Sequence, residues 1–165
     1  MAIDFALHHP DWVRSLVLID SVGFSGSFPV GQFLPRSLIE LGADWLRFRK
    51  SAALSAALTL PMMNSGLVDA LRCSLLHQEM PGWKEAIVSF SQSGGYAELS
   101  DRIHQIQHRT LILWGMSDDI LGTQDATRFR VAISGSELVW INSAGHVPHF
   151  DQPRSVAEHL LSFAN

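Results

Sequence analysis

The stretch Thr110-Leu111-Ile112-Leu113-Trp114-Gly115 decides the fold, because it is apolar without interruption from Leu111 to Trp114. A half-exposed strand alternates apolar and polar residues, whereas a parallel strand covered on both faces is apolar at successive positions. The residues from Met116 to Gly122 then have the polar, glycine-ending character of a loop. We therefore expect a parallel sheet that is covered on both faces.

Two further runs, Ser15 to Asp20 and Glu137 to Ile141, have the same apolar character and are predicted as strands of the same sheet. The segments from Gln124 to Ile133 and from Arg154 to Phe163 carry apolar residues at helical spacing, which predicts covering helices. Repeated strand–loop–helix units predict an α/β fold.

The middle third of the chain, residues 23–100, contains helical periods and breakers such as Pro61 and Gly94-Gly95 but no convincing strand. We interpret it as a helical cap inserted over the carboxyl edge of the sheet, where open α/β sheets bind their ligands. The predicted organisation is a core helix and strand at 1–22, a helical cap or lid at 23–100, and the rest of the core at 101–165.

Composition excludes several classes of function. A chain that is 47% hydrophobic and 17% charged is globular, and a net charge of −4 without a basic stripe disfavours nucleic acid and membrane surfaces as partners. The single cysteine, Cys73, rules out an internal disulfide and fits a reducing compartment, so we expect a cytoplasmic location. Because Cys73 falls in a predicted helix from Leu67 to Gln78, we expect it to be a small buried apolar residue.

The whole chain resembles the α/β-hydrolase family. Residues 2–20 resemble the helix after the nucleophile turn and the next strand, and residues 93–96 resemble the end of the cap. Residues 111–122 resemble the strand and loop that carry the family's acid, and residues 144–150 resemble its histidine loop. The resemblance implies the C-terminal part of an α/β-hydrolase fold, with parallel strands, covering helices and an inserted helical cap.

The resemblance implies catalytic roles for Asp118 and His146. A serine hydroxyl is a weak nucleophile at neutral pH, so a histidine takes its proton and a carboxylate holds that histidine in the required tautomer. In this fold the acid and the histidine follow the nucleophile along the chain, on loops after strands. The family's acid comes three residues after the glycine of the Trp-Gly pair, which selects Asp118, with Asp119 as the alternative.

Other functions for the polar residues carry less weight. Asp118, Asp119, His146 and His149 together could form a metal site, but the hydrolase pattern explains the same residues, so no metal or cofactor is expected. His149 is expected to be a packed loop residue. The large apolar residues of the predicted cap are expected to form mainly the cap's own core, with a few touching substrate; they include Phe28, Phe33, Trp45, Met62, Met63, Met80 and Trp83.

The nucleophile is missing from the sequence, because none of the 165 residues forms a Gly-x-Ser-x-Gly turn. The nearest candidates lack the strand-to-helix context of that turn: residues 91–95 follow a predicted helix, and Ser21 has no glycine before it. We therefore expect an α/β-hydrolase-family enzyme, of serine type, acting on a small apolar ester, thioester or carbon–carbon bond, and represented by a chain that is inactive alone. A non-catalytic ligand-binding protein and an inactive truncated fragment are the alternatives.

The strand at residues 15–20 would have one unpaired edge without the strand that leads into the nucleophile turn. A bare apolar edge strand promotes association. The resemblance to the α/β hydrolases implies a small-molecule substrate as one partner. We also expect either a completing N-terminal segment or self-association through this edge.

Overall fold

The computed structural model describes residues 2–25, 28–59, 65–96 and 98–165. The chain divides into two compact units, of which one comprises residues 1–27 and 96–165 and the other residues 28–95. We call them the sheet unit and the helical unit. Each is described by itself.

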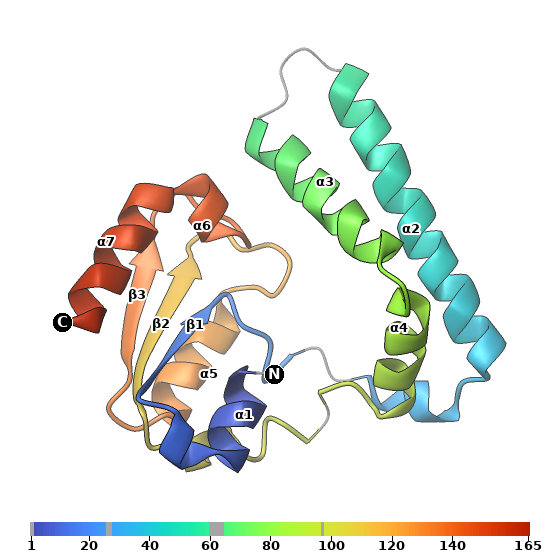
Figure 1. Ribbon diagram of the computed structural model, residues 1–165. Coiled ribbons are helices and arrows are strands. Elements are labelled where there is room, and N and C mark those ends of the chain that lie inside the picture. Colours follow the sequence, from blue (N-terminus) through green and yellow to red (C-terminus); the bar gives the residue numbers. More distant parts are fainter. Residues whose placement is uncertain (1, 26–27, 60–64, 97) are drawn as a thin grey trace. The chain divides into compact units, whose positions relative to one another are not determined.

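The sheet unit contains three parallel strands, β1 (Ser15–Ile19), β2 (Arg109–Gly115) and β3 (Glu137–Ile141), in the order β1-β2-β3. Figure 1 shows β2 between the other two. These are the strands that the sequence predicts, each within a residue at either end. Their pairing places the carboxyl ends of all three at one edge of the sheet.

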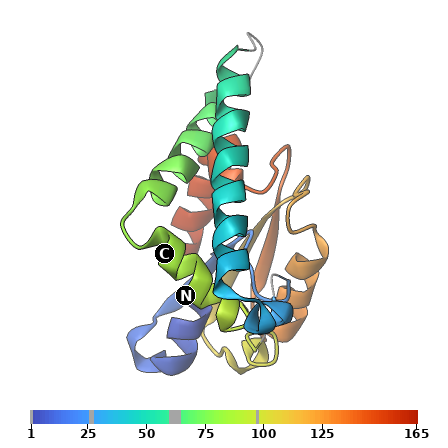
Figure 2. The same ribbon diagram turned by 90° about the vertical axis from the view of Figure 1, so that its right-hand side faces the viewer.

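Helices cover both faces of this sheet. One face packs against α1 (Ala2–His8) and α5 (Gln124–Ala132), and the other against α7 (Pro153–Ala164), which follows the single turn α6 (Pro148–Asp151). Figure 2 shows α5 and α7 on opposite sides of the strands.

Successive residues of β2 supply the two cores. Ile112 and Trp114 pack on the side of α5, whereas Leu111 and Leu113 pack on the side of α7. All four are at most 1% exposed, which explains why the run is apolar at every position. Parallel strands with covering helices confirm the predicted fold class.

The helical unit is built from α2 (Arg36–Thr59), α3 (Ser65–Glu79) and α4 (Trp83–Gln92). Helix α2 packs against both α3 and α4. The entrance and exit of the unit meet, because the backbone N–H of Phe28 donates to the carbonyl of Gly94 at 3.0 Å.

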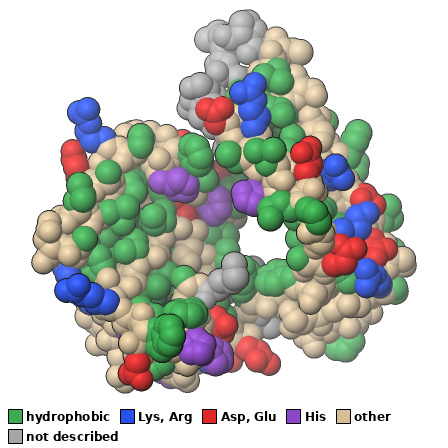
Figure 3. Space-filling model, in the orientation of Figure 1, with side chains coloured by type: hydrophobic (Ala, Val, Ile, Leu, Met, Phe, Trp, Pro, Cys, Tyr) green, Lys and Arg blue, Asp and Glu red, His purple; other side chains and the backbone are tan. Residues whose placement is uncertain are grey.

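Charged side chains of both signs gather on the helical unit (Figure 3). Arg36 and Glu40 pair along α2 at 2.6 Å, and Lys84 of α4 pairs with Asp44 of α2 at the same distance. Such exposed pairs are screened by solvent and contribute little to stability.

The expectation that the large apolar residues form the core of this unit is wrong for most of those described. Phe28, Phe33, Trp45 and Met80 are exposed, by 42% to 84%, whereas Trp83 is half-buried. Small and aliphatic side chains are buried instead, namely Ile39, Ala43, Ala57 and Val88. Met62 and Met63 lie outside the described residues.

Cys73 also differs from its prediction. It lies in α3 as expected but is exposed, so it is not a buried apolar residue. The helix carries apolar residues on every side, so the sequence did not define its buried face.

Among the described residues, no helix is both long and apolar enough to cross a membrane.

Candidate functional site

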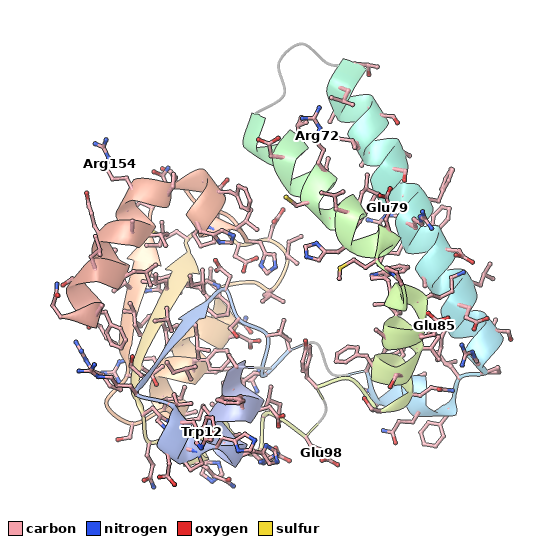
Figure 4. The ribbon with its side chains drawn as sticks, viewed as in Figure 1. Trp12, Arg72, Glu79, Glu85, Glu98 and Arg154 are labelled. Atoms are coloured by element: carbon pink, nitrogen blue, oxygen red, sulfur yellow. The ribbon has the colours of Figure 1, made fainter. Side chains whose placement is uncertain are left out.

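The site lies at the carboxyl edge of the sheet, on the loops that follow the three strands. Figure 4 marks the two ends of the sheet unit: Trp12 lies in the turn before β1, and Arg154 lies near the start of α7, at the end toward which the strands run. Asp20, Asp118 and His146 follow β1, β2 and β3 respectively. Residues far apart in the sequence are thereby brought to one edge.

Asp118 and His146 are in direct contact. The imidazole Nδ1 lies 3.1 Å from the Asp118 Oδ2. The Asp118 side chain is fully buried, whereas that of His146 is one-third exposed. A proton on Nδ1 satisfies the carboxylate, which leaves Nε2 as the nitrogen that can accept a proton from a reacting group.

Backbone groups fix the Asp118 carboxylate. Its Oδ1 accepts hydrogen bonds from the N–H groups of Ile120 at 2.9 Å and Leu121 at 3.0 Å. Together with His146, three donors therefore surround this carboxylate and fix its orientation. Asp119 is exposed, so the structure places Asp118 rather than its neighbour against the histidine.

The histidine loop is held against the end of β2. Ser117 donates its backbone N–H to the Ala144 carbonyl at 2.9 Å, and Met116 donates to Ile141 at 3.1 Å. The Asp151 carboxylate accepts from the Gly145 N–H at 2.9 Å, directly before His146. This role of Asp151 could not be predicted from the sequence, where its position six residues after Gly145 is the only signal.

His149 does not join the pair. It lies in α6, is exposed, and contacts the ring of Phe150 with a centroid distance of 4.9 Å, so its prediction as a packed loop residue is wrong. Throughout the part of the chain that the structure describes, no group of three or more His, Cys, Asp or Glu side chains is arranged to hold a metal ion.

Asp20 is a further acid at the site, although the sequence pattern marks it only as the end of a predicted strand. It is 6% exposed, and its Oδ1 accepts a hydrogen bond from the Gly115 N–H at 2.9 Å. Burial raises the pKa of the Asp20 carboxyl to about 7, and the negative charge of Asp118 acts in the same direction. The Gly115 hydrogen bond and His146 act in the opposite direction but do not cancel these effects.

Two serines, Ser21 and Ser93, were considered as nucleophiles from the sequence, and the structure gives each of them a local hydrogen bond. The Ser21 hydroxyl donates to the Val22 carbonyl at 3.3 Å. Ser93 ends α4 in the helical unit, where its hydroxyl donates to Phe90 at 2.8 Å. Both hydroxyls are thus bonded to backbone carbonyls close to them in the sequence.

A parallel sheet with an acid and a histidine on the loops after two of its strands is the arrangement that the sequence led us to expect of an α/β hydrolase. Residues 2–159 match the sequence profile of the Alpha/beta hydrolase family, and the chain belongs to this family.

Two curated relatives align with the whole chain. Alpha/beta hydrolase domain-containing protein VTE7 of Arabidopsis thaliana is 29% identical, and the alignment covers 50% of that protein. A 2-hydroxymuconate semialdehyde hydrolase of Pseudomonas sp. (strain CF600) is 26% identical, with 56% of its length covered. The chain thus spans about half the length of the curated relatives it matches.

A thermophilic esterase from Thermogutta terrifontis shares the fold, with a TM-score of 0.68 at 20% identity. The alignment covers 99% of this chain and 60% of the esterase chain.

Proposed function

We propose that this protein hydrolyses an ester, thioester or carbon–carbon bond of a small, mostly apolar substrate, with His146 as general base and Asp118 as the acid that orients it. The 3.1 Å contact between His146 Nδ1 and the Asp118 carboxylate carries this proposal. The buried acid and the partly exposed imidazole are suited to proton transfer at a site open to substrate. The name of the 26% identical Pseudomonas relative, a semialdehyde hydrolase, supports a hydrolytic reaction.

In the proposed mechanism, Nε2 of His146 accepts the proton of a serine hydroxyl as the oxygen attacks the substrate carbonyl. Asp118 stabilises the imidazolium that forms. The imidazolium then protonates the leaving group, and water, activated by the same histidine, releases the acyl group. An aspartate nucleophile would instead make the protein an epoxide or halide hydrolase.

The nucleophile would come from a segment outside the 165 residues, which contain no Gly-x-Ser-x-Gly turn. Two observations support such a segment. The chain spans about half of its curated relatives, and in the described structure β1 pairs with β2 along one edge and with no strand along the other. We propose that a parallel strand of the completing segment pairs with this free edge of β1.

Without that segment, the free edge of β1 should promote self-association of the chain. We expect sedimentation velocity at increasing protein concentrations to show a rising weight-average mass. Adding the completing segment should return the chain to a defined heterodimer. A monomer at every concentration, with a sharp melting transition, would contradict the expectation.

A fluorophosphonate probe tests the catalytic proposal, because it reacts covalently only with an activated serine. We expect rapid labelling of the complete protein, meaning the chain together with the segment that supplies its nucleophile, and none of this chain alone. The variant His146→Ala should label at least about a hundredfold more slowly, since the hydroxyl loses its base.

The matched controls are Asp119→Asn and His149→Ala, because each replaces an exposed neighbour of the same residue type. Both should label at the rate of the unaltered protein. Equal labelling of the His146→Ala variant would contradict the proposed role of His146. Absence of labelling together with saturable ligand binding would favour the alternative, a non-catalytic binding protein.

A further inference from the structure

Asp20 is held in an unusual position beside the proposed catalytic pair. It has a φ of 36°, a left-handed conformation that residues with side chains rarely adopt. Its backbone N–H donates to the Leu113 carbonyl at 3.1 Å, and its Oδ1 accepts from the Gly115 N–H at 2.9 Å. The carboxyl group is therefore fixed to the end of β2, just before the loop that carries Asp118.

The second oxygen of this carboxyl is buried without a donor. Asp20 Oδ2 has no hydrogen-bond partner among the described residues. The acid whose charge acts on the Asp20 carboxyl is Asp118. An ionised carboxylate only accepts hydrogen bonds, so two neighbouring carboxylates leave each other unsatisfied and repel. One proton on the pair removes both problems.

The distribution of donors shows which of the two acids holds that proton. Among the described residues, Asp118 accepts three N–H bonds, from Ile120, Leu121 and His146, whereas Asp20 accepts one, from Gly115. A carboxylate that already accepts several N–H bonds is the better acceptor of one more proton donor. Asp118 is therefore the acceptor of the pair.

We propose that the two acids share one proton, which lies on Asp20 and is donated in a hydrogen bond to the Asp118 carboxylate, so that Asp20 is a positioning residue for the Asp118–His146 pair. The positioning role rests on the proposed function, whereas the shared proton does not.

The charged groups acting on Asp20 fit this arrangement. They are Asp118, which raises the pKa of Asp20, and His146, which lowers it; burial is the largest cause, and the pKa rises to about 7. Between about pH 4 and pH 7 the folded protein keeps this proton while the unfolded chain has lost it. The free energy of unfolding therefore falls as the pH rises through this range, and the contribution is lost above the folded-state pKa.

The shared proton is tested by ¹³C NMR of the aspartate carboxyl carbons during a pH titration of the protein. We expect the Asp20 carboxyl carbon to titrate with a midpoint near 7. The Asp118 carbon should show a secondary response at the same midpoint, and the variant Asp20→Asn should abolish this response. The asparagine keeps both bonds, since its oxygen accepts from Gly115 and its amide donates to Asp118, but it does not titrate.

Thermal melting gives a second readout with a matched control. Between about pH 5 and pH 8 the unaltered protein should lose about 5 °C more in Tm than Asp20→Asn does. The control Asp125→Asn also removes a buried carboxylate. Because that carboxylate is bonded to donors, Ser25 N–H at 2.8 Å and Arg128 at 3.1 Å, the control should lower Tm without flattening its pH dependence.

An Asp20 midpoint near 4 in the unaltered protein, or a pH dependence of Tm that is the same with and without Asp20, would overturn the proposal. Neither measurement requires turnover. A failure of the proposed hydrolase activity would therefore be seen separately from a failure of the shared proton.

Discussion

Replacing Asp118 with asparagine should lower kcat of the complete protein by about 10⁴-fold, equivalent to about 5.5 kcal/mol in the activation barrier. The two N–H donors of Ile120 and Leu121 require an oxygen at the Oδ1 position, so the new amide group must face His146. An amide donor there forces Nδ1 to act as an acceptor and moves the ring proton to Nε2. In that tautomer the histidine cannot take the nucleophile's proton.

The matched control is Asp119→Asn, which replaces the exposed neighbouring aspartate and should retain kcat within about twofold. The downfield proton resonance of His146 Nδ1–H should be present in this control and absent in Asp118→Asn. Equal turnover by the two variants would contradict the assignment of Asp118 as the acid.

The second large effect is expected at Gly115, the last residue of β2. A Cβ at this position would lie 2.1 Å from the Gly145 carbonyl oxygen and 2.7 Å from that of Ala144. Both are backbone atoms of the histidine loop, so they cannot move aside as a flexible side chain would. Gly115→Ala should destabilise the sheet unit by about 3 kcal/mol or more, because the histidine loop must separate from β2. Urea denaturation measures this loss.

Gly145→Ala is the matched control, since it adds the same methyl group to the facing histidine loop but directs it away from the contact with Gly115. The nearest atoms to its Cβ would lie 3.7 Å away, which is ordinary van der Waals contact. We expect the stability of this control to change by less than about 1 kcal/mol. If both variants unfold at the same urea concentration, the prediction is contradicted. The close approach of Gly115 to the Gly145 and Ala144 carbonyls would then not be the reason that glycine is required there.

The parts of the fold that could be predicted from the sequence are those with a local signal. The run from Leu111 to Trp114 is apolar at every position because both its faces are buried, so the strand, its parallel pairing and its covering helices follow from the pattern. Asp118 and His146 could be placed together because the resemblance to the α/β hydrolases implies their roles and each follows a predicted strand of this sheet.

The neighbourhood of Asp20 could not be predicted in this way. A single aspartate after a strand is equally typical of a turn. Its partners, Gly115 and Asp118, become neighbours only through the register between β1 and β2, which joins residues almost a hundred positions apart. The burial that chiefly raises the pKa of Asp20, and the nearby charge of Asp118 that adds to it, are properties of tertiary structure.

The core of the helical unit was predicted wrongly for a related reason. Large apolar residues were expected inside, but the contacts of α2 with α3 and α4 bury small residues such as Ala43. Small side chains let helices approach closely, and composition alone does not show which face of an apolar helix makes that approach.

The hydrogen bond between Phe28 and Gly94 has a consequence for how this chain can vary. Because the two ends of the helical unit meet, the unit is a closed excursion between β1 and β2, and the distance that the chain must span there does not depend on the unit's length or sequence. The entropy of loop closure also rises only slowly with loop length. The helical unit is thus a replaceable module, in which residues can be added, removed or exchanged while the strand register that joins Asp20 to the end of β2 is preserved.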